Sequence, residues 1–135
     1  MSNLTLTDAF AEYGATRRSP YDYSAIAKDG SVVVSCWGQL LKDQENGIWR
    51  YKVDDLSAWT SNPGSRNLFK RHLEYALAED RPIRLIIAQE KDNPPPKIAG
   101  TDGRKIRKTY SVRKDRVGKV VFFDGNKVNI DFKKE

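Results

Sequence analysis

A short, almost wholly apolar segment at residues 83–88 limits the folds that are open to this chain. Its sequence is Ile-Arg-Leu-Ile-Ile-Ala, and a run of this kind is typical of a strand that is covered on both faces. It follows a helical pattern over residues 66–79, which Ser65 can cap and in which apolar residues recur three and four positions apart. The two segments together predict a central strand with one long helix packed across its sheet.

Shorter strands are expected on both sides of this pair. Before it, residues 21–27, 31–37 and 48–53 are separated by the turn signals Asp29-Gly30 and Asn46-Gly47, which predicts an antiparallel meander. After it, residues 91–108 contain three consecutive prolines and predict a long loop. A second meander is then expected over residues 109–114, 119–123 and 127–132, with turns at residues 116–118 and at Asp124-Gly125.

The chain has 135 residues, a length that fits one domain spanning residues 1–135. We expect an α+β fold, a curved antiparallel sheet or partly open β-barrel of about six to seven strands, with the long helix packed across it. A short N-terminal helix is expected over residues 7–14. No run approaches the roughly 20 apolar residues of a membrane span, and residues 1–8 lack the pattern of a secretory signal. These observations predict a cytoplasmic protein without a membrane partner.

Positive charge is concentrated at the C-terminal end. The net charge is +6, and residues 96–135 alone hold 12 Lys and Arg residues against 5 Asp and Glu residues. Such a cluster attracts polyanions, although lysines also protect exposed strand edges in proteins that bind no nucleic acid. The residues predicted to contact phosphates are Arg104, Lys105, Arg107, Lys108, Arg113, Lys114 and Arg116.

Aromatic residues gather in and beside the first predicted meander. Aromatic faces next to basic side chains are the usual equipment for stacking nucleic-acid bases. The residues predicted to offer such a face are Tyr23, Trp37 and Trp49. The alternative is that these rings fill the core of a domain with few leucines.

The residues needed for catalysis are scarce. A single cysteine, Cys36, excludes an internal disulfide, and a single histidine, His72, argues against an all-protein zinc centre. Both fall at positions where a packed side chain is expected. A metal-dependent nuclease would have to use Asp124, Asp131 and Lys133. We therefore predict no catalytic residue, no metal site and no cofactor, with the nuclease kept as an alternative.

The first third of the chain resembles a group of small uncharacterised proteins from bacteria, phages and mobile elements. The shared features are Ser19-Pro20-Tyr21-Asp22-Tyr23-Ser24-Ala25, the Asp29-Gly30 turn, and Val32-Val33-Val34 leading to Trp37. Residues 67–78 and 83–88 are similar to the second half of that group. The order of elements is also similar to that of PUA and EVE barrels, which bind RNA or modified DNA bases. That fold-level analogy assigns no site residue.

The leading hypothesis from the sequence is a non-enzymatic nucleic-acid-binding domain. Basic C-terminal strands would contact phosphates, and aromatic residues of the first meander would stack a base. A protein-interaction or accessory factor from a mobile element is the alternative, and the small nuclease is the second alternative. The sequence leaves open a homodimer, and it does not distinguish DNA from RNA.

Overall fold

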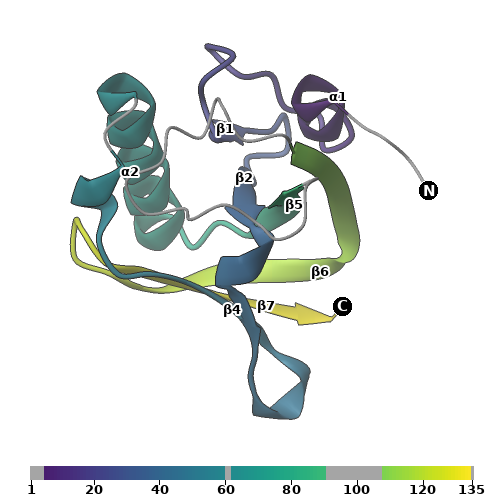
Figure 1. Ribbon diagram of the computed structural model, residues 1–135, viewed down its shortest axis with the longest axis vertical. Coiled ribbons are helices and arrows are strands. Elements are labelled where there is room, and N and C mark those ends of the chain that lie inside the picture. The colour runs from purple at the N-terminus through teal and green to yellow at the C-terminus, as the bar shows by residue number, and fades with distance from the viewer. Residues whose placement is uncertain (1–4, 60–61, 91–107, 135) are drawn as a thin grey trace.

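The computed structural model describes residues 5–59, 62–90 and 108–134, which form one seven-stranded sheet and two α-helices (Figure 1). The helices are α1 (Leu6–Ala11) and α2 (Pro63–Ala78). The strands are β1 (Ser24–Ile26), β2 (Val32–Trp37), β3 (Leu41–Asp43), β4 (Trp49–Val53), β5 (Ile83–Glu90), β6 (Lys108–Phe123) and β7 (Val128–Lys134). Three short 3-10 turns, Gly38–Leu40, Glu45–Gly47 and Leu56–Ala58, connect strands and helices.

The sheet is strongly curled, and the chain connectivity requires it to be. Its strand order is β1-β2-β5-β6-β7-β4-β3, so β2 and β3 lie five places apart. In a flat sheet that separation would be about 24 Å. However, only Gly38–Leu40 joins the two strands, and a connection of this length spans at most about 14 Å. The sheet therefore curls around an inner face, although it does not close into a barrel.

The predicted fold class is confirmed, because the protein is α+β with a curved open sheet, one long helix and a short N-terminal helix. The predicted pairing is wrong in two places. The sheet is mixed rather than antiparallel, since β2 runs parallel to β5. In addition, β4 pairs with β3 and β7 and not with β2. A parallel pair needs a long crossover connection, and the chain between β2 and β5, including α2, supplies it.

One long strand replaces the two strands and the turn predicted over residues 109–123. β6 continues from Lys108 to Phe123, and a large bulge interrupts its pairing with β5. Arg84 pairs with Val117 while Ile86 pairs with Val112, so four β6 residues lie opposite Leu85. The bulge bends β6 sharply (Figure 1). The rest of the loop predicted over residues 91–108 lies outside the described residues.

The helices begin at other residues than predicted. α2 starts at Pro63 behind Asn62, in line with the preference of proline for the first turn. Ser65, the predicted cap, is buried and donates a hydrogen bond to Asp22 instead. α1 is capped by the Thr5 hydroxyl, which accepts a hydrogen bond from the Asp8 amide at 3.0 Å.

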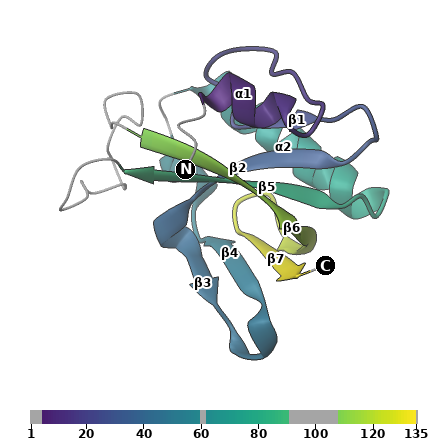
Figure 2. The same cartoon turned by 90° about the vertical axis from the view of Figure 1, so that its right-hand side faces the viewer.

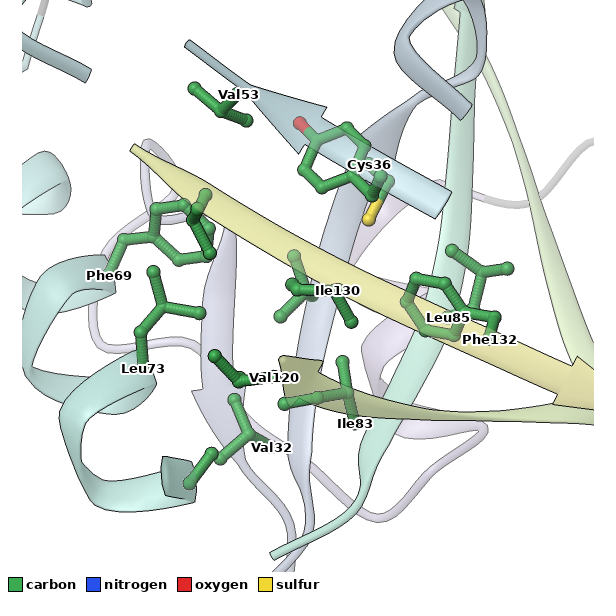
Figure 3. Close-up of a cluster of buried hydrophobic side chains, with 14 of the residues drawn as sticks. Val32, Cys36, Val53, Phe69, Leu73, Ile83, Leu85, Val120, Ile130 and Phe132 are labelled. Atoms are coloured by element: carbon green, nitrogen blue, oxygen red, sulfur yellow. The ribbon is translucent and has the colours of Figure 1, made fainter. Parts of the chain in front are cut away.

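The main core fills the inner face of the sheet. Phe69 and Leu73 of α2 point into the curl of the sheet, where they meet side chains from β2, β4, β5, β6 and β7 (Figure 3). The fully buried inner-face residues include Val32, Val34, Tyr51, Ile83, Leu85, Ile130 and Phe132. Gly118 leaves room for the Phe132 ring, because a Cβ atom at position 118 would lie 2.5 Å from the ring.

The outer face of the sheet is only partly covered. α1 packs over one end of it through Ala9 and Phe10, which contact Ala25, Val33 and Ile86. The β3–β4 hairpin extends away from both helices (Figure 2). Among the described residues, no element covers the outer face of β4, β7 and the second half of β6.

Candidate nucleic-acid interface

Basic side chains form a row across the uncovered outer face. In antiparallel pairs the directly opposed residues share a face, and along a strand every second residue does so. Arg50 is paired with both Lys42 and Asp131, Asp131 is paired with Lys119, and Val117 is paired with both Lys133 and Arg84. The pairing and alternation place six cations from five strands on one face. We call them the outer basic row: Lys42, Arg50, Lys52, Arg84, Lys119 and Lys133.

Most of this row is accessible to a polyanion. The side chains of Lys52 and Lys119 are 62% and 68% exposed. Each lies near an exposed carboxylate at the rim, Lys52 at 3.9 Å from Asp54 and Lys119 at 3.3 Å from Asp80. Exposed pairs of this kind are weak. A phosphate chain can therefore compete for both lysines.

One carboxylate lies within the row itself. Asp131 accepts two hydrogen bonds from the Arg50 guanidinium, at 2.6 and 2.9 Å. This bidentate pair occupies Arg50 and fixes its orientation. Lys42 and Lys133 form no ion pair with any described residue. The row consequently keeps an excess of positive charge.

An apolar pair lies on the same face. Val120 pairs with Ile130 and Phe122 with Asn129, so Val121 is an extra residue without a partner. This bulge leaves two consecutive large apolar residues open to solvent, with Val121 47% and Phe122 45% exposed. Asn129 is also paired with Lys52 of β4, which brings the Phe122 ring into the row of cations.

The predicted stacking residue Trp49 is engaged by arginines of the β6 bulge. The guanidinium carbon of Arg116 lies 3.6 Å from the centre of the Trp49 ring, and that of Arg113 lies 4.7 Å from it. Arg116 is buried and donates a hydrogen bond to the Gly47 carbonyl at 2.7 Å. The cation–π contacts tie the bend of β6 to β4. Arg113 and Arg116, which the charge pattern predicted to contact phosphates, thus have a structural role.

The other predicted phosphate contacts are distributed differently. Arg113 also forms a bidentate pair with Asp115, at 3.0 and 2.9 Å. Lys114 lies 3.0 Å from Glu12 just after α1. Lys108 begins β6, but its side chain is outside the described part of the chain, as are Arg104, Lys105 and Arg107. The structure thus brings Arg113 and Arg116 together at Trp49, and directs Lys114 toward the N-terminal segment.

Tyr23 and Trp37 pack against the inner core. The Tyr23 ring meets Trp59 and Phe69 edge-on, with centroids 5.3 and 5.2 Å away. Its hydroxyl is buried without a hydrogen-bond partner, and burial raises the pKa of Tyr23 above its usual range. Trp37 is half-buried against the same core. In these positions the two rings act as packing residues, which is the alternative that the sequence offered.

A buried polar cluster fastens the segment before β1 to α2. Asp22 is 1% exposed and accepts hydrogen bonds from Arg18 at 3.0 Å and from the Ser65 hydroxyl at 2.6 Å. Burial by itself would raise the pKa of Asp22, but the bonds from Arg18 and Ser65 outweigh it and hold this pKa below its ordinary value. The carboxylate is thus a charged anchor between two segments.

His72 belongs to the same region. Its Nδ1 lies 2.8 Å from the Ser24 hydroxyl. Burial lowers the pKa of His72, although Asp22 acts in the opposite direction. A serine beside a histidine has the composition of a nucleophile and its base. Ser24, however, is 1% exposed within β1, so its hydroxyl has no access to a substrate in this conformation.

The carboxylates of the nuclease alternative serve structural contacts. Asp124 accepts hydrogen bonds from the backbone amides of Asn126 and Lys127, at 2.9 and 2.7 Å, and so closes the β6–β7 turn. Asp131 is held by Arg50, and Lys133 belongs to the outer basic row. Within the described ranges, no three His, Cys, Asp or Glu side chains are grouped so that they could hold a metal ion.

None of the described helices has the length and apolar character needed to cross a membrane. Comparison with protein-family models, with curated proteins and with solved structures finds no match to this chain.

Proposed function

We propose that this protein is a non-enzymatic, cytoplasmic nucleic-acid-binding domain that holds phosphates on its outer sheet face. The observation that supports this proposal is the outer basic row, in which six cations from five strands share the outer face of the sheet. Arg50 is held by Asp131, and Arg84, Lys52 and Lys119 lie 4.0, 3.9 and 3.3 Å from Asp29, Asp54 and Asp80, while Lys42 and Lys133 form no ion pair with a described residue. Neighbouring strands are about 4.8 Å apart. Lys42 and Arg50 are directly opposed, whereas Arg50 and Lys119 lie two strands apart, about 10 Å, as do Arg84 and Lys133. The face thus offers several separate contacts to the phosphates of one strand of nucleic acid.

Binding of this kind releases counterions and weakens as salt is added. Four cations of the row are exposed lysines: Lys42, Lys52, Lys119 and Lys133. If each contacts one phosphate, the logarithm of the association constant falls with the logarithm of salt concentration with a slope of about −3 to −4. Base identity contributes little to such contacts, so the affinity depends weakly on sequence.

The test is charge reversal on the two faces of the molecule. The variant Lys52→Glu/Lys119→Glu changes the outer basic row, and both lysines are exposed. The matched control Lys70→Glu/Arg71→Glu changes net charge equally, but it lies on α2, which packs against the opposite face. Affinity for a fluorescein-labelled 20-nucleotide strand is measured by anisotropy at low salt and at physiological salt.

We expect the outer-face variant to lose about tenfold or more in affinity. The slope of its log association constant against log salt concentration should become shallower by the amount expected for the loss of about two phosphate contacts. The α2 control should stay within about threefold of the parent. Equal losses in the two variants would mean that net charge alone attracts the nucleic acid. No loss in the outer-face variant would refute this site.

A further inference from the structure

We infer that the nucleic acid bound on this face is single-stranded and that Phe122 stacks on one of its bases. The inference deepens the proposed function and rests on it. A stable fold normally buries a side chain as large and apolar as that of Phe122. Phe122 is 45% exposed on the outer face, beside the similarly exposed Val121 and near the β6–β7 turn.

The bulge at Val121 is the local cause of this exposure. Without the extra residue, strict alternation would place the residue after Val120 on the outer face and the next residue on the inner face. The bulge instead leaves both Val121 and Phe122 on the outside, while Phe123 is partly buried against the inner core. Bulges of this kind often redirect a side chain at a functional surface.

The surroundings of the ring suit a base and its phosphates. Across the sheet from Phe122 lie Asn129 of β7 and then Lys52 of β4, and Lys119 precedes the ring on its own strand. A base stacked on Phe122 would thus have cations on two sides for the flanking phosphates. The side-chain amide of Asn129 makes no hydrogen bond to a described residue. It can therefore donate a hydrogen bond to the edge of that base or accept one from it.

Two features favour a single strand over a duplex. Bases inside a duplex are already stacked on one another, so a ring on the sheet surface reaches only bases that are free. The outer face is also convex, because the sheet curls around the inner core. A duplex is itself a convex cylinder and would touch such a surface over a small area, whereas a flexible single strand can follow it.

The test uses labelled single strands of DNA and of RNA and a duplex of the same sequence, each titrated by anisotropy at low salt. The variants are Phe122→Leu, which keeps apolar bulk but removes the ring, and Phe122→Tyr, which keeps the ring. Leu77→Ala is the matched control, because Leu77 is 48% exposed on α2. Circular dichroism establishes that each variant is folded.

We expect the parent to bind single strands at least about tenfold more tightly than the duplex. Phe122→Leu should weaken single-strand binding by about 5- to 150-fold, the range for loss of one stacked base. It should leave duplex binding unchanged, as Phe122→Tyr and Leu77→Ala should leave both. Equal affinity for duplex and single strands, or an unaltered Phe122→Leu variant, would overturn the inference.

The two proposals fail in different ways. If Lys52→Glu/Lys119→Glu weakens binding while Phe122→Leu does not, the phosphate-binding face stands and base stacking on Phe122 is refuted. If neither strand nor duplex binds at low salt, both proposals are wrong.

Discussion

Replacement of Gly118 by alanine tests the packing that curls the sheet. Gly118 on β6 is paired with Ile83 of β5 and with Phe132 of β7. A Cβ atom at this position would lie 2.5 and 2.6 Å from two carbons of the Phe132 ring, and 3.1 Å from the Ile83 Cβ. The Phe132 ring is completely buried. The substitution must therefore displace a core ring or separate two strands.

Overpacking of a core by one methyl group typically costs about 1–3 kcal/mol. The lower backbone entropy of alanine in the unfolded chain offsets about 0.4–1 kcal/mol of this cost. We expect Gly118→Ala to lower the free energy of unfolding by about 1–2 kcal/mol, with a drop in Tm of about 3–10 °C. Urea unfolding followed by tryptophan fluorescence measures the change.

The cause can be isolated with a second substitution, Phe132→Leu, which removes the ring that meets the new methyl group. In this background Gly118→Ala should cost less than about 0.5 kcal/mol, so the two substitutions should be strongly coupled. If Gly118→Ala costs the same in both backgrounds, or costs nothing in the parent, the described packing of β6 on β7 is wrong.

Three further predictions concern the other buried groups. Arg116→Met should destabilise the fold by about 1–3 kcal/mol, because it removes the guanidinium from Trp49 and a charged hydrogen bond; an unchanged urea midpoint would contradict this. Asp22→Asn should destabilise the protein by about 1–3 kcal/mol at pH 7 through loss of the Arg18 pair. Since the pKa of Asp22 is lowered on folding, its contribution is present above the usual value of 3.8 and is lost as pH falls through the folded pKa; a parent–variant difference that stays constant below pH 4 would refute the assignment. Burial raises the pKa of the Cys36 thiol, so Ellman's reagent should react with it in urea but not in the folded protein, and rapid labelling without urea would show that Cys36 is accessible.

Features that depend on neighbouring residues could be predicted from the sequence. The apolar run at residues 83–88 is the central strand β5, and the helical periodicity before it is α2. The Asp29-Gly30 and Asp124-Gly125 turn signals are confirmed by backbone geometry, since Gly30 and Gly125 have φ angles of +87° and +98°, whereas the turn predicted at residues 116–118 lies inside β6. Local sequence suffices here because periodicity and the φ preference of glycine are properties of a few adjacent residues.

Strand pairing could not be predicted in this way. Alternation in residues 48–53 shows which side chains share a face, but not which strand lies beside them. The actual partner of β4 is β7, which begins some 75 residues after β4 ends. A pairing between segments so far apart leaves no trace in the local sequence. The continuous strand β6 was missed for a similar reason. Its bulge is stabilised by contacts of Arg113 and Arg116 with Trp49 of a distant strand.

The sequence predicted the types of residue in the candidate site but not which residues form it. The sequence indicated basic residues beside aromatic rings, whereas the structure groups a different set of them on the outer face. A signal was present in the alternation of Arg50 with Lys52 and of Asp131 with Lys133, in which one face of each strand is charged. It became a surface only through the pairing of β4, β7 and β6. The exposure of Phe122 had no local signal, because it depends on the bulge.

Chemical-shift mapping locates the face of the protein on which a bound strand lies. The ¹⁵N-labelled protein is titrated with a short single-stranded oligonucleotide at low salt, and amide shifts are followed residue by residue. We predict that the largest changes fall on β4, on β7 and on β6 from Val117 to Phe122, and that those on the exposed side of α2 are negligible. Changes confined to α2, or no changes at saturating oligonucleotide, would contradict nucleic-acid binding by the outer face.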